Sequence, residues 1–132
     1  MQLNIQDTFN KELPADAKQD NSRRQVMEAC FSYVTPRVPS APQLLHASPE
    51  VAQKLGLSLA DIQSEEFLQV FSGANVLKDT APYAMCYGGH QFGHWAGQLG
   101  DGRAINLAEV VHHDQRWAMQ LKGAGETPYS RR

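Results

Sequence analysis

Two features in the last third of the sequence could bind phosphate: a glycine-rich turn and a lysine that follows it. The turn covers residues 97–103 and reads Gly-Gln-Leu-Gly-Asp-Gly-Arg. Gly100 and Gly102 leave backbone N–H groups open to an anion, and the guanidinium fork of Arg103 suits a phosphate. Lys122 closes a Met-Gln-Leu-Lys run and adds a mobile point charge. The combination is typical of sites that hold nucleotide phosphates.

Each of these features also has a purely structural explanation. Asp-Gly is a common hairpin turn, and a lysine at the end of a strand is often only solvated. The dinucleotide-binding pattern G-x-G-x-x-G and the Walker sequence, which needs a Lys-Ser or Lys-Thr pair, are both absent from the chain. The hypothesis of a phosphate site therefore depends on the spacing between the turn and Lys122.

The elements that would position these residues are strands joined by turns. Residues 104–111 alternate between apolar and polar side chains, which predicts a half-buried strand. Residues 113–116 predict a turn, and residues 117–122 predict a second strand that ends at Lys122. A glycine loop, a strand, a turn and a strand-borne lysine follow one another in kinase-like phosphate sites.

Helices and a short strand are predicted before this region. Residues 30–34 favour a strand. Ser48, followed by proline, is a good N-cap and begins a helix that Gly56 can close. A second helix is predicted over residues 64–72. Residues 1–24 are polar, and we expect them to be extended or loosely ordered.

The histidines raise the question of a metal site. His90 and His94 are four residues apart, and His112 and His113 follow. Zinc takes three or four such ligands, and the four-residue spacing brings two of them together on a helix. Glycines next to His90 and His94 oppose that helix. We therefore expect no metal ligands among these residues.

Charge and composition limit the classes of partner. The 132 residues carry a formal net charge of −2, which provides no basic field for nucleic acid. No run approaches the roughly 18 apolar residues of a membrane span, and the first residues resemble neither a signal nor a transit peptide. Cys30 and Cys86 are interpreted as reduced thiols, since two cysteines make no disulfide framework. A cytoplasmic location is expected.

Three motifs resemble those of the selenoprotein O family, and together they are highly specific. They cover residues 87–93, 98–104 and 121–125. Residues 29–33 and 127–131 also fit the family, so that the resemblance spans nearly the whole chain. Members of this family are protein adenylyltransferases with a kinase-like fold.

The resemblance implies transfer of AMP from ATP to Ser, Thr or Tyr hydroxyls of proteins, with ATP and Mg²⁺ as cofactors. It assigns Gly100, Gly102 and Arg103 to the nucleotide-binding loop. Lys122 would contact the phosphates. The catalytic base and the magnesium ligands are expected downstream of Arg132, so neither a catalytic nor a metal-binding residue is expected in this chain. The chain alone is therefore expected to be inactive.

The sequence thus predicts an α+β fold, a partial kinase-like N-lobe with a glycine-loop β-hairpin and flanking helices. Residues 1–132 would be the amino-terminal part of a kinase-like adenylyltransferase domain, with the remainder missing. Two alternatives stay open: a kinase-like phosphotransferase, and a non-catalytic nucleotide-binding or interaction module. Glu126 and Ala108 depart from the family's usual proline and glycine, and neither change removes an expected nucleotide contact.

Overall fold

The computed structural model describes residues 1–131 and has the α+β architecture that the sequence predicts. Its sheet is five-stranded and antiparallel, in the order β1-β2-β4-β5, and β3 pairs with β2. The strands are β1 (Phe31–Tyr33), β2 (Tyr83–Gln91), β3 (His94–Gly100), β4 (Ala104–His112) and β5 (Gln115–Lys122). The helices are α1 (Phe9–Glu12), α2 (Pro49–Lys54), α3 (Leu59–Ile62) and α4 (Glu65–Ser72). Within residues 1–131, the helices are too short to cross a bilayer.

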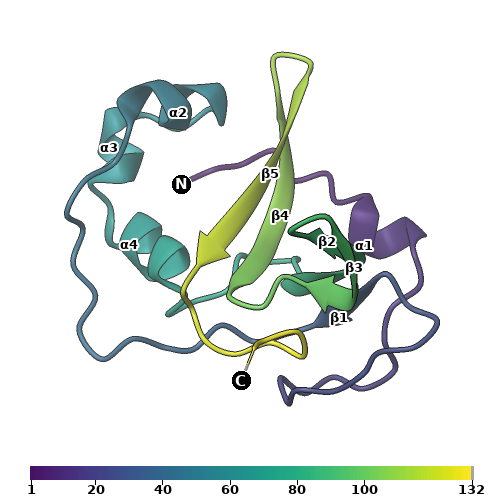
Figure 1. Ribbon diagram of the computed structural model, residues 1–132. Helices are drawn as coiled ribbons and strands as arrows, with labels where there is room; N and C mark the ends of the chain where they lie inside the picture. The colour runs from purple at the N-terminus through teal and green to yellow at the C-terminus, as the bar shows by residue number, and fades with distance from the viewer. Residues whose placement is uncertain (132) are drawn as a thin grey trace.

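The hairpin of β4 and β5 stands in the middle of the molecule, beside α2, α3 and α4 (Figure 1). Both predicted strands are confirmed, and Lys122 is the last residue of β5. The turn is shorter than predicted, because only His113 and Asp114 lie outside the strands. Their positive φ angles of 47° and 59° suit a two-residue hairpin turn. Gln115 and Arg116, which the sequence assigned to the turn, belong to β5.

The strand β4 is more deeply buried than its alternating pattern predicts. Every residue from 104 to 110 is buried. On one side Leu107 and Val110 pack with Val70 of α4. The amino-terminal segment adds cover of its own, since Ile5 bridges to Val110 along the β4 edge that is not paired with β5. The prediction of a half-buried strand was wrong because residues far away in the sequence, in α4 and in the amino-terminal segment, pack against β4.

Residues 1–24 are attached to the sheet more closely than their polar composition indicates. The Asp7 carboxylate accepts a hydrogen bond from the backbone N–H of Glu109 at 2.7 Å. The Glu109 carboxylate in turn accepts from the backbone N–H of Phe9 at 2.9 Å. The ring of Phe9 stacks on Tyr83 with 5.4 Å between centroids. Polar side chains here bind specific backbone groups of β4, so low hydrophobicity does not mean loose order.

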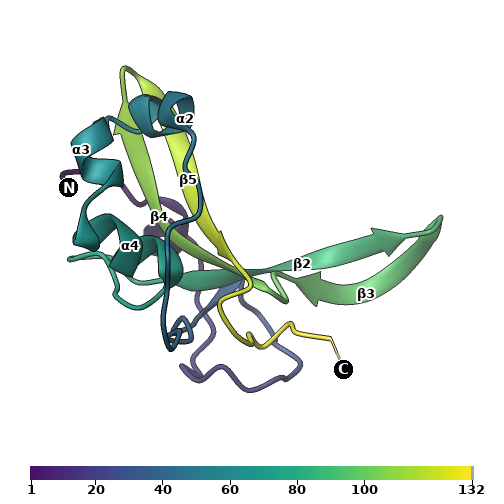
Figure 2. The same ribbon diagram turned by 90° about the vertical axis from the view of Figure 1, so that its left-hand side faces the viewer.

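The strands β2 and β3 form a second hairpin, which projects as an arm from the rest of the molecule (Figure 2). This arm was not predicted, and residues 97–100 of the presumed turn belong to β3. Its own turn is Phe92-Gly93, with positive φ angles of 50° and 79°. A side chain at Gly88 would meet the ring of Trp95 on the neighbouring strand. Glycines that read as loop residues therefore make room for side chains across the arm.

The two predicted helices are confirmed as α2 and α4. The Ser48 hydroxyl accepts a hydrogen bond from the backbone N–H of Val51 at 3.3 Å, and the Ser64 hydroxyl accepts one from Phe67 at 3.1 Å. Gly73 closes α4 in the left-handed conformation, at a φ of 86°.

Candidate functional site

All four residues that the sequence assigns to phosphate binding line one cleft. Gly100, Gly102, Arg103 and Lys122 share this cleft, whose volume is about 1190 Å³. One wall is the arm, from which residues 87–91 contribute. The other parts of the lining come from the end of β5, the segment that follows it, and the residues just after β1. The structure therefore brings the sequence-predicted residues together in one place.

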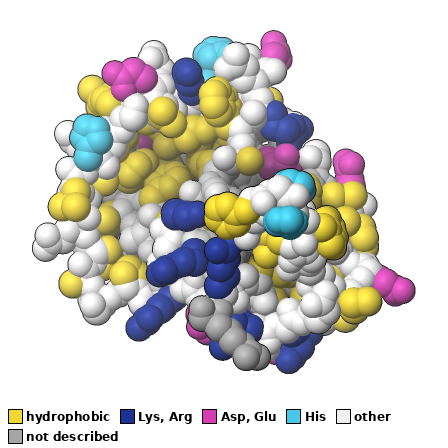
Figure 3. Space-filling view, viewed as in Figure 1, with side chains coloured by type: hydrophobic (Ala, Val, Ile, Leu, Met, Phe, Trp, Pro, Cys, Tyr) yellow, Lys and Arg dark blue, Asp and Glu magenta, His cyan; other side chains and the backbone are white. Residues whose placement is uncertain are grey.

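The lining of the cleft is strongly cationic. It holds four basic side chains and one carboxylate. They are Arg37, Arg103, Lys122 and Arg131, with Glu126 as the acid. The whole chain, in contrast, carries a formal net charge of −2. Figure 3, which draws the face seen in Figure 1, shows lysine and arginine side chains gathered near its middle. Such a concentration of positive charge suits a polyanionic ligand.

The cations are not neutralised by neighbouring acids. Arg37, Arg103 and Lys122 make no ion pair with a carboxylate of residues 1–131. All three side chains are exposed toward solvent. Their charge is therefore available to a ligand in the cleft.

The β4–β5 hairpin explains the spacing between the glycine loop and the lysine. Pairing within the hairpin sets Lys122 opposite Ala104, the first residue of β4. The backbone N–H of Gly123 then donates to the carbonyl of Arg103 at 2.8 Å. The side chains of Arg103 and Lys122, which are almost twenty residues apart in sequence, therefore start from neighbouring backbone positions.

Asp101 anchors the loop between β3 and β4. Its carboxylate accepts hydrogen bonds from the backbone N–H of Met85 and from the Asn106 amide, each at 2.9 Å. Its carbonyl accepts from the hydroxyl of Thr127, a fully buried residue, at 2.7 Å. The Ser130 hydroxyl donates to the carbonyl of Gly102. Asp101 therefore has a structural role, and the loop is held from both sides.

The glycines of this loop serve its packing rather than a left-handed turn. A side chain at Gly100 would clash with the carbonyl of Met85 and the ring of Tyr129. A side chain at Gly102 would come within 2.8 Å of the Tyr129 carbonyl. The backbone N–H groups of Asp101 and Gly102 already donate to Met85 and Gly100, so these two groups do not form the anion-binding arrangement that the sequence suggested.

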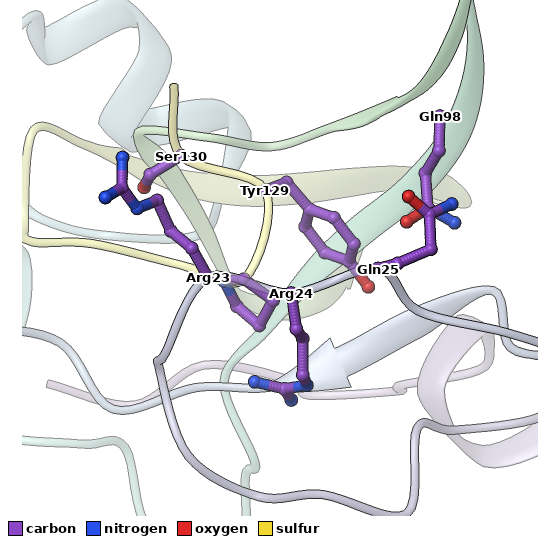
Figure 4. A pocket seen from close by; sticks show the side chains of 7 residues that line it. Arg23, Arg24, Gln25, Gln98, Tyr129 and Ser130 are labelled. Atoms are coloured by element: carbon purple, nitrogen blue, oxygen red, sulfur yellow. The ribbon is translucent and has the colours of Figure 1, made fainter. Parts of the chain in front are cut away.

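Tyr129 and Ser130 line the cleft and also line a smaller pocket of about 440 Å³, which Figure 4 shows. The Tyr129 hydroxyl is hydrogen-bonded to that of Ser32 at 2.8 Å, and burial raises the pKa of Tyr129 to about 12. The phenol therefore stays neutral at physiological pH. In the smaller pocket Arg24 is committed to Asp16, with 2.6 Å between Nη2 and Oδ2. This pocket consequently offers less free charge than the cleft.

Sequence reasoning missed Arg37, which lies in the proline-rich connector after β1. Its backbone N–H donates to the carbonyl of Ala124 at 2.7 Å, which brings it to the edge of the cleft. Because Arg37 and Ala124 are 87 residues apart in sequence, no local pattern predicts the contact between them. Tyr129, Ser130 and Arg131, a few residues after Lys122, also line the cleft. Arg132, the next residue, lies outside the described residues.

The histidines lie on two different hairpins. His90 and His94 belong to β2 and β3 of the arm, so the helical spacing between them has no role. His112 and His113 are at the turn of the other hairpin, with 4.0 Å between ring centroids. Within residues 1–131 no three His, Cys, Asp or Glu side chains are grouped as a metal site would require.

The chain is similar to known proteins along nearly its whole length. The family described as "Protein adenylyltransferase SelO" matches residues 16–132. Proteins named "Protein nucleotidyltransferase YdiU" are 60% identical in Flavobacterium johnsoniae, over 129 residues, and 54% identical in Tolumonas auensis, over 130 residues. Each match covers 98% of this chain and 25% of the relative, so the chain spans a quarter of the length of these curated relatives. The chain belongs to the protein adenylyltransferase SelO family.

Proposed function

We propose that this chain is the ATP-binding portion of a protein adenylyltransferase. The observation that carries the proposal is the cleft, in which the glycine loop, Arg103 and Lys122 meet under an excess of positive charge. A nucleoside triphosphate has the negative charge that such a cleft favours. The family, whose relatives are named protein nucleotidyltransferases, supports nucleotide transfer as the reaction.

The proposal includes a kinase-like N-lobe. Support comes from the order of elements: an arm, an anchored loop, β4, a two-residue turn and β5 with its terminal lysine. In kinase-like sites a glycine-rich hairpin covers the phosphates and a strand lysine contacts them. Here the arm lines one wall of the cleft and Lys122 lies at another. A cytoplasmic location is also part of the proposal, supported by the free thiols of Cys30 and Cys86.

The residues of this chain would bind and orient ATP rather than perform the transfer. Arg103 and Lys122 would balance the charge of the phosphates. Because Gly100 and Gly102 have no side chains, the loop can pack closely against Met85 and Tyr129, which would leave room for the nucleotide in the cleft. Bound with ATP, Mg²⁺ would supply further charge neutralisation. We place its ligands and the catalytic base beyond residue 132. The acceptors would be Ser, Thr or Tyr hydroxyls of proteins. The hydroxyl oxygen would attack the α-phosphorus of ATP and displace pyrophosphate, and the hydroxyl proton would pass to the catalytic base.

The test is a chimaera in which this chain replaces the matched quarter of the Flavobacterium johnsoniae relative. It is incubated with Mg²⁺, protein acceptors and ATP labelled on either the α- or the γ-phosphorus. We expect protein to acquire the α-label and not the γ-label. Lys122→Ala should lower this transfer at least tenfold, because a cation at the phosphates is lost. The chain on its own should transfer no label.

Two outcomes would count against the proposal. Transfer of the γ-label would mean a phosphotransferase. Full α-label transfer by the Lys122→Ala chimaera would remove the lysine from the site. A matched control is Lys78→Ala, which removes the same charge from an exposed position in the loop before β2 and should leave transfer unchanged.

A further inference from the structure

We infer that Arg37 is an additional phosphate-binding residue of the cleft, a role that neither its sequence context nor the glycine-loop motif assigns to it. The inference rests on the proposed function, since it takes ATP as the ligand. Its starting point is that Arg37 lines the same cleft as Arg103 and Lys122 but comes from a different part of the chain, the connector between β1 and α2.

The backbone positions of three basic residues lie around one short segment, residues 122–124. Lys122 is the first residue of this segment. Arg103 is tied to it by the hydrogen bond from Gly123, at 2.8 Å, and Arg37 by its own bond to Ala124, at 2.7 Å. Successive carbonyls and amides of a single segment therefore fix all three positions. Cations arranged on different sides of a ligand can contact several phosphate oxygens at once.

The backbone beneath Arg37 is held in place before any ligand binds. The N–H of Val34 donates to the Pro82 carbonyl at 3.0 Å, and the N–H of Thr35 donates to the Asn21 side chain at 3.1 Å. Gly125 allows a close approach, because a Cβ there would lie only 2.9 Å from that of Arg37. A fixed base for a long side chain reduces the entropy that is lost when the side chain binds a ligand.

The side chain itself remains free for that ligand. Arg37 is exposed, and no carboxylate of residues 1–131 pairs with it. Arg24 shows what a structural arginine looks like in this protein, since it is bound to Asp16 at 2.6 Å and donates to several carbonyls. Arg37 has none of these commitments within the described residues. Arg37 is part of the lining of the cationic cleft, and a guanidinium fork is suited to phosphate.

The experiment measures the dissociation constants of ATP, AMP and adenosine for the chain and for four variants: Arg37→Ala, Arg37→Lys, Lys122→Ala and Lys78→Ala. Arg37→Ala should weaken ATP binding about tenfold and leave adenosine unaffected, because the lost contact is to phosphate. Arg37→Lys should recover part of the loss, since it keeps the charge without the fork. Lys78→Ala removes a charge outside the cleft and should change binding less than about twofold.

The outcomes separate this inference from the proposed function. If Lys122→Ala weakens ATP binding and Arg37→Ala does not, the inference is wrong and the proposed function stands. An equal loss of ATP and adenosine affinity would also overturn it, because it would indicate a general structural effect. If the parent chain binds no ATP, the proposed function is wrong, and the inference about Arg37 is wrong as well because it depends on that function. Should Arg37→Ala not fold, Arg37→Lys and Arg37→Gln provide the same comparison.

Discussion

The two hairpins of this protein are similar in length and opposite in character. In the β4–β5 hairpin, residues 104–110 are all buried, and two apolar clusters hold β4 in place. The arm formed by β2 and β3 ends in exposed aromatic rings, with Phe92 97% and Trp95 73% exposed. The arm, residues 83–100, also contains no Asp, Glu, Lys or Arg. One hairpin thus carries the charged groups on a rigid base, and the other supplies an uncharged wall.

This difference shows how the cleft is built. Lys122 and Arg103 lie at the end of the buried hairpin, where their backbone positions are fixed by strand pairing. The arm approaches them with glycines and neutral side chains, which leave space and add no competing charge. Ligand affinity should therefore depend on the β4–β5 side, and access to the cleft on the arm.

The largest contrast should appear in stability. Ile105 of β4 is fully buried, so Ile105→Ala should lower the free energy of unfolding by about 2–5 kcal/mol. Phe92→Ala at the tip of the arm should change it by no more than about 0.5 kcal/mol. Urea titration of both variants measures the two values. A comparable loss in both would mean that the arm is packed rather than projecting.

A smaller contrast is expected between glycines at the two ends of β3. Gly100→Ala forces a methyl group against the Met85 carbonyl and the Tyr129 ring and should cost about 3 kcal/mol. At Gly93 no atom lies within 4 Å of an added Cβ, and only the positive φ of 79° opposes alanine, at about 1 kcal/mol. Thermal and urea unfolding give both numbers. If Gly93→Ala lowers the free energy of unfolding more than Gly100→Ala does, the end of β3 at Gly100 is not the more tightly packed end.

The smallest effect concerns the pH dependence of the buried hairpin. Burial alone would raise the pKa of Glu109, but hydrogen bonds from the N–H groups of Thr8 and Phe9 outweigh it and lower the pKa below the usual 4.5. A lowered pKa stabilises the folded state above pH 4.5, and this contribution disappears as the pH falls through the folded-state value. Glu109→Gln should therefore lose less stability than the parent between pH 7 and pH 3. Parallel curves of unfolding free energy against pH would contradict this account.

The elements that the sequence predicts well are those with local signals. Ser48 and Ser64 mark helix starts through their own side chains, and the alternation of β4 is read within one strand. The arm was missed because its glycines hide the strand pattern, and their purpose depends on Trp95 and Leu99 across the hairpin.

The candidate site follows the same rule. Arg103 and Lys122 were predictable because one hairpin joins them, whereas Arg37 reaches the cleft through a contact with Ala124 that no local pattern contains. The roles of Gly100 and Gly102 also depend on distant residues, those around Tyr129. The sequence suggested that the backbone N–H of Gly102 is open to an anion, but this group already donates to the carbonyl of Gly100.

The most direct test of the central claim is an NMR titration of the ¹⁵N-labelled chain with ATP. If the cleft binds the nucleotide phosphates, the amide signals of Gly102, Arg103 and Gly123 should shift in a saturable manner. Asp114, at the far turn of the β4–β5 hairpin, should not respond. Adenosine should produce smaller shifts at the loop, because it lacks the phosphates. Saturable shifts confined to other surfaces, or no shifts at all, would contradict the assignment of this cleft to ATP.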